Sequence, residues 1–438
     1  MLMQSTSTVK KAVISNRIYL SVTPELEMAL EKSLTYVLPL RHKEVVPVVI
    51  CDVVTIRPGL ISIPSGRQDL IPSGYEIIDK RVSAPIEFCQ PKISLRVSQQ
   101  QVVDEWESSG LLHANTSFGK TFTAIHLIAK LKQKTLVVLH TVALRDQWFH
   151  EIKKVLGITP SIIGSGGFDT RSPITIANIQ TLRRRIDTNP ELNSMFGTII
   201  IDEAHLSPAK TFNDVIDASK AKNKIALSAT PIRKDGKSVY LYDYFDKYNI
   251  VHPKEENAMT PEVHIYITKI PFPFKQSGNW SKELTKLYEN KQFMEHIFHV
   301  ANAYATLGYQ CLVPADRVFF LETLHSNNGA ISELVTAKTE DREEIFTKFL
   351  QHKKEILYAS TKIVSTGISI NTLSCLVLTA PINNESLLTQ LIGRIKRVRE
   401  GKHQPIIVDT FLTGGVVTHQ QQKRIHWYEK QGWKIKYI

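Results

Sequence analysis

The sequence predicts an α/β protein in which a small α+β domain precedes two consecutive parallel-sheet domains. Short apolar runs alternate with helical patterns in two series, which is typical of parallel strands with helices on both faces. A polar, proline-flanked stretch at 251–261 separates the two series, so we expect domains at 91–255 and 256–414. The expected strands are 111–114, 135–140, 174–179, 198–202 and 224–228, and then 263–268, 310–313, 355–359, 374–378 and 405–409.

Residues 1–90 have a different pattern and are expected to form the small α+β accessory domain, whose residues indicate no chemistry by themselves. Residues 17–22 read as a strand, and Thr23 followed by Pro24 and Glu25 is a favourable helix start. β-rich runs follow at 45–56 and 59–63. The residues expected on one face of the helix are Leu26, Leu30, Leu34 and Val37.

The last stretch, 415–438, is basic and rich in aromatic residues. Such a mixture suits phosphate contacts combined with base stacking. The alternative is a terminal element whose aromatic side chains pack on the preceding domain, which is the commoner fate of aromatic residues.

The composition indicates the kind of partner that the protein binds and the compartment in which it works. The 438 residues carry a formal net charge of +12, which favours a polyanionic partner such as nucleic acid. Cys51, Cys89, Cys311 and Cys375 match no zinc or disulfide pattern, so we expect buried thiols in a reducing compartment. With no apolar run of roughly 18 residues and no apolar signal core at the N-terminus, we expect a cytoplasmic protein.

The segment Leu111–Ala124, LLHANTSFGKTFTA, matches the phosphate-binding loop G-x-x-x-x-G-K-S/T except that Ala114 replaces the first glycine. Lys120 would reach the β- and γ-phosphates of a nucleotide, and the Thr121 hydroxyl would hold Mg²⁺. A turn without a ligand is the alternative. The loop residues expected to surround the phosphates are Asn115, Thr116, Ser117, Phe118 and Gly119.

A second segment, TIIIDEAH, places two carboxylates directly after a β-branched run. Ligands bind at the carboxyl ends of strands in open α/β sheets. Asp202 would coordinate Mg²⁺, and Glu203 would orient and deprotonate the water that attacks the γ-phosphate. A solvated acidic turn is the alternative, but a hydrolytic site needs both this pair and the loop upstream.

With these two segments in place, the chain resembles the superfamily-two helicases that carry a DEAH box, over residues 95–409. The resemblance implies two RecA-like domains with ATP and Mg²⁺ between them. Arg96 and Gln99 would read adenine, and Gly367 and Gln390 would also contact the nucleotide. Arg394 and Arg397, spaced to share a helix face, would act as arginine fingers. The residues implied in nucleic-acid contact or coupling are Thr141, Gly166, Gly167, Gln180, Thr181, His205, Ser228, Ala229, Thr230, Thr361 and Thr366.

Within that superfamily the chain looks most like the phage UvsW-type helicases, with the XPB and RecG groups as wider relatives. This implies a monomer that remodels forks and Holliday junctions in host cytoplasm, together with other replication or recombination proteins. Residues 360–370 resemble motif V of the superfamily and residues 390–397 resemble motif VI, and Ser369 and Leu391 depart from these motifs. Ser117 and Phe118 depart from the usual phosphate loop. The rival functions are a duplex translocase that does not separate strands, an RNA helicase, and a DNA-binding scaffold switched by ATP.

Overall fold

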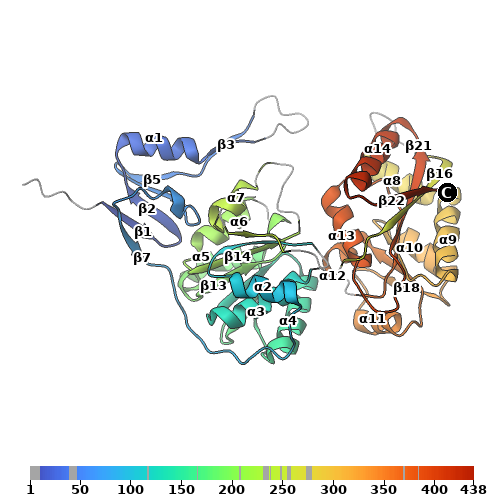
Figure 1. Ribbon diagram of the computed structural model, residues 1–438, viewed down its shortest axis with the longest axis horizontal. Coiled ribbons are helices and arrows are strands. Elements are labelled where there is room, and N and C mark those ends of the chain that lie inside the picture. The colour runs from blue at the N-terminus through green and yellow to red at the C-terminus, as the bar shows by residue number, and fades with distance from the viewer. Residues whose placement is uncertain are drawn as a thin grey trace, which may run out of the picture. The chain divides into compact units, whose positions relative to one another are not determined.

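The computed structural model divides the chain into two compact units (Figure 1). Apart from the loop residue Asn115, the first unit holds the described residues up to 253 and the second holds those from 258 onward. The structure describes residues 10–38, 47–115, 118–164, 166–206, 209–229, 236, 238–246, 249–253, 258–272, 279–367, 370–382 and 384–438.

The chain begins with a five-stranded sheet in the order β5-β6-β2-β1-β7, flanked by one helix and a two-stranded β3-β4 ribbon. The helix starts as expected, because the Thr23 hydroxyl accepts a hydrogen bond from the Leu26 N–H at 3.4 Å. It ends at Ser33, so Leu34 lies at its cap and the exposed Val37 belongs to a strand, contrary to the expected helical face. The elements are β1 (Lys11–Ile14), β2 (Arg17–Ser21), α1 (Pro24–Ser33), β3 (Thr35–Val37), β4 (Val49–Cys51), β5 (Val54–Arg57), β6 (Leu60–Pro64) and β7 (Glu76–Asp79).

An eight-stranded sheet in the order β11-β10-β12-β9-β13-β14-β8-β15 follows, with every pairing parallel except β10 with β11. Its core divides into two layers, one packed under α2, α3 and α4 and the other under α5, α6 and α7. The strands are β8 (Gly110–His113), β9 (Thr135–Leu139), β10 (Ser161–Gly164), β11 (Gly167–Phe168), β12 (Ile174–Asn178), β13 (Thr198–Ile201), β14 (Asn223–Ser228) and β15 (Ile250–Val251). The helices are α2 (Val97–Glu105), α3 (Lys120–Leu131), α4 (Val142–Leu156), α5 (Ile179–Thr188), α6 (Ala209–Ala218) and α7 (Val239–Tyr244).

The second unit contains a seven-stranded parallel sheet in the order β18-β19-β17-β20-β21-β16-β22. All the strands expected in both series are present, which confirms the predicted α/β class. The strands are β16 (Glu262–Pro271), β17 (Cys311–Ala315), β18 (Ser332–Val335), β19 (Ile356–Ser360), β20 (Cys375–Leu378), β21 (Ile406–Thr413) and β22 (Lys434–Tyr437). The helices are α8 (Trp280–Glu289), α9 (Lys291–Thr306), α10 (Val318–Ser326), α11 (Arg342–Leu350), α12 (Thr361–Gly367), α13 (Glu385–Ile395) and α14 (Gly415–Lys430).

The basic, aromatic stretch at 415–438 forms α14 and β22, and β22 pairs with β16 in the second sheet. Tyr428 is fully buried, and its hydroxyl donates to Asp409 Oδ2 at 3.0 Å. Arg424 forms an ion pair with the same buried carboxylate at 2.8 Å. Packing on the preceding domain is therefore what the structure shows for these side chains. The four cysteines are free, and Cys51 and Cys89 are exposed, contrary to the expected burial.

The small N-terminal sheet is joined to the first parallel sheet by a buried polar network. Arg17 is 6% exposed, and its Nη1 lies 3.0 Å from both Asp52 Oδ1 and Asp217 Oδ1 and 2.8 Å from the Tyr244 hydroxyl. Arg67 Nη1 reaches Asp243 Oδ1 at 3.1 Å. Since three of these partners lie on α6 or α7, the N-terminal sheet is packed against these two helices of the first unit.

The backbone also approaches closely at this junction. A Cβ atom at Gly66 would lie 2.6 Å from the Asp243 carbonyl oxygen, so only glycine fits there without a shift. The buried Lys224 amine, from β14, donates to Ser65 Oγ at 2.8 Å and to the Asn16 carbonyl oxygen at 3.2 Å. Burial lowers the pKa of Lys224 to about 7. The accessory sheet is thus part of the first unit.

Candidate active site

The loop between β8 and α3 is shaped by one glycine and one lysine. Gly119 has φ of +87°, and a Cβ atom there would lie 2.7 Å from Gln99 Nε2. Both observations require glycine. Lys120 begins α3, is 6% exposed, and donates from Nζ to the Ala114 carbonyl oxygen at 2.9 Å. Its ammonium group is therefore held inside the loop, and Thr121 lies beside it in the first turn.

Arg96 and Gln99, at the start of α2, hold this loop from the outside. Gln99 Nε2 donates to the Phe118 carbonyl oxygen at 2.7 Å, and an Arg96 guanidinium nitrogen donates to the same oxygen. Gln99 Oε1 in turn accepts from the Arg96 N–H at 3.0 Å. These contacts fix the loop conformation, and the expected adenine contact remains a prediction.

Asp202 lies at the carboxyl end of β13, on the same sheet as the loop, and is 4% exposed. The Trp148 indole N–H donates to Asp202 Oδ2 at 2.8 Å, and the Glu203 N–H donates to Oδ1 at 2.8 Å. Burial, followed by the Glu203 carboxylate, raises the pKa of Asp202, while Trp148 and the nearby Lys120 ammonium oppose this shift. Because the Asp202 carboxylate is poorly solvated, a bound cation would stabilise its charged form.

Glu203 occupies the left-handed region with φ of +48°, which costs a non-glycine residue roughly 1–3 kcal/mol. Its Oε2 lies 3.4 Å from His205 Nδ1, and the same His205 nitrogen lies 3.0 Å from Ser228 Oγ. Ser228 ends β14, and its carbonyl oxygen accepts from the Ala114 N–H at 3.1 Å. The DEAH segment is therefore connected through Ser228 to the loop that holds Lys120.

These residues fit a nucleotide with Mg²⁺. The loop offers a buried ammonium group and the N-terminus of a 12-residue helix, which suits phosphate. The Asp202 carboxylate and the Thr121 hydroxyl are oxygen ligands of the kind that Mg²⁺ prefers. Among the described residues no group of three or more acidic, histidine or cysteine side chains is arranged to hold a metal ion.

The motif VI segment lies in the second unit and differs from the expected helix. α13 ends at Ile395, so Arg397 lies beyond it and forms a β-bridge with Ala258. The physical reason is that Lys402 Nζ donates to the Ile395 and Arg397 carbonyl oxygens, both at 2.7 Å, and holds the chain away from the helical path. Arg394 and Arg397 therefore do not share a helical face.

Other motif VI residues follow the expected pattern more closely. Gln390 is buried on α13, and Arg394 is half-buried one turn later. Leu391, where relatives often have arginine, is fully buried in the core, which explains the substitution. Arginine-finger roles for Arg394 and Arg397 remain predictions.

The residues expected to contact nucleic acid have varied environments. The Thr141 hydroxyl caps α4 by accepting from the Leu144 N–H at 3.2 Å. Gln180 is exposed in the first turn of α5, with Thr181 half-buried beside it. The other described positions are Gly166 just before β11, Gly167 at its start, Ala229 after β14, and Thr361 at the start of α12. Thr116, Ser117, Thr230 and Ser369 lie outside the described residues, and Thr366 and Gly367 are described only as part of α12.

Sequence reasoning missed Trp148 as part of the site. The residue is fully buried on α4, which the core-facing pattern of that helix explains. A buried indole N–H nearly always needs an acceptor. Trp148 lies 54 residues from Asp202 in the sequence, so this requirement predicts an acceptor without saying which one.

Comparison with known proteins identifies the class. Residues 92–233 match the family model described as "Type III restriction enzyme, res subunit", and residues 295–399 match "Helicase conserved C-terminal domain". With two RecA-like domains and the loop and DEAH segments on the first sheet, the chain belongs to the superfamily-two helicases. No described helix has the length and apolar character needed to cross a membrane.

One relative matches nearly end to end. "Probable helicase D10" of Escherichia phage T5 is 34% identical over 433 residues, covering 97% of this chain and 95% of that protein. A fragment of a putative HsdR subunit of a type I restriction enzyme from Vibrio vulnificus YJ016 shares the fold, with a TM-score of 0.57 and 18% identity over 78% of this chain and 67% of that chain. T4 UvsW aligns over 98% of this chain and 99% of its own at 16% identity with a TM-score of 0.42, so the UvsW-type subgroup stays a prediction.

Proposed function

We propose that this helicase uses ATP and Mg²⁺ to remodel branched DNA. The observation that carries the ATP-hydrolysing part is the buried Asp202 on the same sheet as Lys120, with its two oxygens fixed by the Trp148 and Glu203 N–H groups. A carboxylate held in this way has a fixed orientation, and the Lys120 ammonium of the phosphate loop is near enough to lower its pKa. In such a site catalysis rests on positioning and on electrostatic stabilisation of the transferring phosphoryl group.

Each residue has a defined part in the proposed reaction. Lys120 would bind the β- and γ-phosphates, and Thr121 with Asp202 would hold Mg²⁺, which neutralises charge that develops on the phosphate oxygens. Glu203 would orient and deprotonate the attacking water. The contact between His205 and Ser228 gives the hydrolytic segment a path to β14, by which nucleotide state would reach the nucleic-acid contacts.

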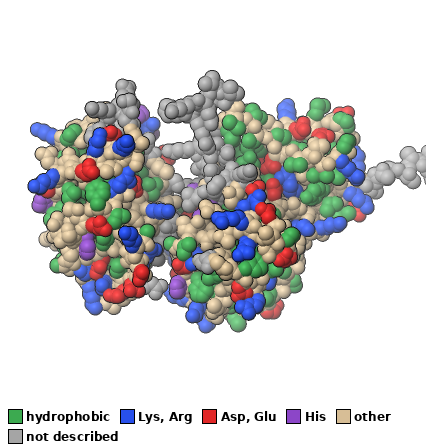
Figure 2. Space-filling model, turned by 180° about the vertical axis from the view of Figure 1, so that it is seen from behind, with side chains coloured by type: hydrophobic (Ala, Val, Ile, Leu, Met, Phe, Trp, Pro, Cys, Tyr) green, Lys and Arg blue, Asp and Glu red, His purple; other side chains and the backbone are tan. Residues whose placement is uncertain are grey.

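The chain's charge supports a nucleic-acid substrate. The net charge is +12, and Figure 2 shows lysine and arginine side chains distributed over both units on the visible face. The contacts on phosphates would supply most of the affinity and make it fall with salt. Single-stranded, duplex, forked and four-way DNA and RNA should therefore be compared at one ionic strength, with ATP turnover as the readout. Forked or four-way DNA should stimulate most, and stimulation by RNA alone would refute the proposal.

One variant tests the ATP site, and assays of the wild-type chain test the rival functions. Lys120→Ala should abolish turnover while DNA binding survives, because the β- and γ-phosphates lose their charge partner; near-normal turnover would overturn the loop assignment. Strand-displacement and translocation assays distinguish a helicase from a duplex translocase. A wild-type chain that binds ATP and DNA without turnover would be a switched scaffold.

We assign the preference for branched over linear DNA to the N-terminal sheet. Removing residues 1–90 would be a poor test of this assignment. Such a truncation would remove the partners of Asp217, Asp243 and Lys224, whose side chains contact that sheet. Neutralising the exposed Arg57 and Lys80 to glutamine leaves this junction intact.

The charge-neutralised variant should lose its preference for branched over linear duplex DNA. The matched control is Lys153→Gln with Lys154→Gln, two exposed lysines on α4. The control should keep the preference while showing a similar general loss of affinity. An unchanged preference in the Arg57 and Lys80 variant would place selectivity elsewhere.

A further inference from the structure

The turn that follows the motif VI helix returns one lysine to the end of that helix. α13 ends at Ile395, and the chain then reverses in a turn whose Lys402 N–H donates to the Arg399 carbonyl oxygen at 3.2 Å. Gly401, inside the turn, has φ of +72° and open space around it, a backbone conformation that glycine adopts without strain. The reversal brings the Lys402 side chain back to the residues at which α13 ends.

The Lys402 ammonium group fixes the backbone beside both motif VI arginines. Its Nζ donates to the Ile395 and Arg397 carbonyl oxygens, both at 2.7 Å. Ile395 directly follows Arg394, and Arg397 is the second arginine itself. A cation at the C-terminus of a helix also interacts favourably with the helix dipole. One side chain therefore sets the path of the chain at both arginines.

The same ammonium group acts on the Arg397 side chain. Burial, followed by the Arg397 guanidinium group, lowers the pKa of Lys402 to about 7. Two positive groups that influence each other in this way repel, and the repulsion is strong where water is largely excluded. The Arg397 guanidinium is therefore favoured in positions directed away from the Lys402 amine or beside an anion.

The chain that enters the second unit binds the same segment. The Met259 N–H donates to the Lys396 carbonyl oxygen at 2.9 Å. Ala258, where the described part of this unit begins, forms a β-bridge with Arg397. The backbone at 396–397 is thus bound both by the entering chain and by Lys402.

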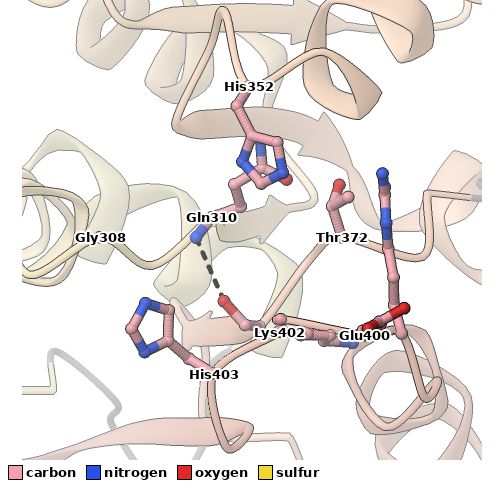
Figure 3. A pocket seen from close by; sticks show the side chains of 10 residues that line it. Gly308, Gln310, His352, Thr372, Glu400, Lys402 and His403 are labelled. Carbon is pink, nitrogen blue, oxygen red and sulfur yellow. Dashed lines mark hydrogen bonds between the residues drawn. The ribbon is translucent and has the colours of Figure 1, made fainter.

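The loop that carries Lys402 borders open space. Figure 3 shows Lys402, Glu400 and His403 along the lower side of a cavity of about 40 Å³, and residues 399–403 all line it. Because one side of the loop faces this cavity, its position depends on its hydrogen bonds, including the two from Lys402 to the end of α13. Replacing Lys402 therefore removes bonds without opening a hole in a packed core.

We propose that Lys402 is a positioning residue for ATP hydrolysis, because its ammonium group sets the backbone from which Arg394 and Arg397 reach the transferring phosphate. The proposal rests on the function proposed above and on the arginine-finger roles predicted for these two residues. Lys402 itself touches neither ATP nor DNA. Since a misplacement of about 1 Å can lower turnover about 10²-fold, the hold on this segment matters for turnover more than for ATP binding.

Without the Lys402 ammonium group, continuation of α13 is favoured. Residues 396–400, KRVRE, contain no glycine or proline that would stop a helix. A longer helix would move Arg397 onto the face of Arg394, since residues three apart share a face. The loss of Lys402 would therefore redirect Arg397 rather than unfold the unit.

The test measures DNA-stimulated ATP turnover of full-length variants over a range of ATP concentrations. Lys402→Met removes the charge and the donors, so kcat should fall about 10–100-fold while KM for ATP changes less than about threefold. Lys402→Arg keeps a cation with several N–H donors and should restore most of the turnover. Arg394→Ala and Arg397→Ala, measured in parallel, show whether the motif VI arginines act in turnover.

Lys354→Met is the matched control within the same unit. The Lys354 amine donates at 2.8, 3.0 and 3.2 Å to three carbonyl oxygens, those of Gly329, Ala330 and Ser332. The control therefore removes the same kind of lysine–carbonyl bonds beside β18 instead of α13. Unfolding curves establish that both methionine variants are folded, and kcat should fall in Lys402→Met but not in Lys354→Met.

The outcomes separate this inference from the function on which it rests. An unchanged kcat in Lys402→Met, together with slow turnover in Arg394→Ala or Arg397→Ala, would overturn the inference and leave the proposed function in place. Equal losses in Lys402→Met and Lys354→Met, or a Lys402→Arg variant as slow as Lys402→Met, would overturn it as well. Normal turnover in both arginine variants would refute the arginine-finger roles and this inference together, whereas a wild-type chain without turnover would refute the proposed function itself.

Discussion

Replacing Arg17 with methionine should loosen the N-terminal sheet from the first parallel sheet. The guanidinium group makes ion pairs with Asp52 and Asp217, both at 3.0 Å, and donates to the Tyr244 hydroxyl. Methionine has a similar length but no charge or donor. The change leaves the Asp52 and Asp217 carboxylates without their shared cation at the junction between the two sheets.

The loss in the free energy of unfolding depends on how exposed the Asp52 and Asp217 carboxylates are. Removing one partner of a buried pair costs about 3–5 kcal/mol. The Asp217 side chain is 34% exposed and can be solvated, whereas that of Asp52 is only 11% exposed. Asp52 can escape by taking up a proton, because burial already raises its pKa to about 6. We therefore expect a loss of about 3 kcal/mol at pH 7, at the lower end of that range.

The loss should be smaller at pH 5. Asp52 is then largely protonated even with Arg17 present, so removing the guanidinium exposes no uncompensated charge there. By the same reasoning, adding Asp52→Asn to the Arg17→Met variant should restore part of the stability at pH 7. Arg183→Met is the matched control, because Arg183 also pairs with two aspartates but is more exposed and should lose less.

The assay is urea unfolding read by hydrogen exchange of peptides from β1 and β2. A whole-chain signal would mix two units, which need not unfold together. A loss below about 1 kcal/mol would refute the reasoning, since surface pairs contribute that little. Equal losses at pH 5 and pH 7 would show that Asp52 is not the group left uncompensated.

Three further changes probe other parts of the first unit. Glu203→Gln should bind ATP and Mg²⁺ but turn over on the order of 10²–10⁴-fold more slowly, as separate binding and turnover measurements would show; loss of binding would point to a structural role. Trp148→Phe removes a donor to Asp202 worth about 1.5–3 kcal/mol, so turnover should fall at limiting Mg²⁺ and recover at high Mg²⁺, and a loss that Mg²⁺ does not affect would contradict this. Lys224 has its folded pKa lowered to about 7, so the unfolded chain binds more protons between about pH 7 and 10 and stability should rise with pH. Lys224→Met should reduce that rise when unfolding is compared at pH 7 and pH 9, and an equal rise in both proteins would argue against it.

Whereas β10, β11, β15, β18 and β22 were not predicted, the strands expected in the two series could be predicted from the sequence because both parallel sheets are covered on both faces. Their strands are continuous apolar runs, which few other structures produce. The loop and the DEAH pair could be predicted for a similar reason, since each is a short local pattern that follows such a strand. The positions of Lys120 and Asp202 on one sheet follow from these two facts.

The features that were not predicted depend on distant contacts. Nothing near Arg17 in the sequence announces Asp217, which lies 200 residues away. The spacing of Arg394 and Arg397 predicted a shared face, but a later residue, Lys402, determines where the helix ends. The helix after Thr23 likewise ends at Ser33, and a strand follows it. The helical spacing of apolar residues continues to Val37, so the sequence pattern alone did not predict this end.

The pairing of β22 with β16 imposes an order on synthesis. β16 is the first strand of the second sheet and β22 is supplied by residues 434–437, so these neighbours leave the ribosome about as far apart in time as the unit allows. At roughly 5–20 residues per second, β16 waits on the order of 10–30 s for this partner. For most of that time β21, the other neighbour of β16, is also missing, so both edges of β16 carry unpaired N–H and C=O groups, which favour association with other chains. The nascent second unit is therefore where we would look for chaperone contact, while the first unit has all of its strands before β16 is made.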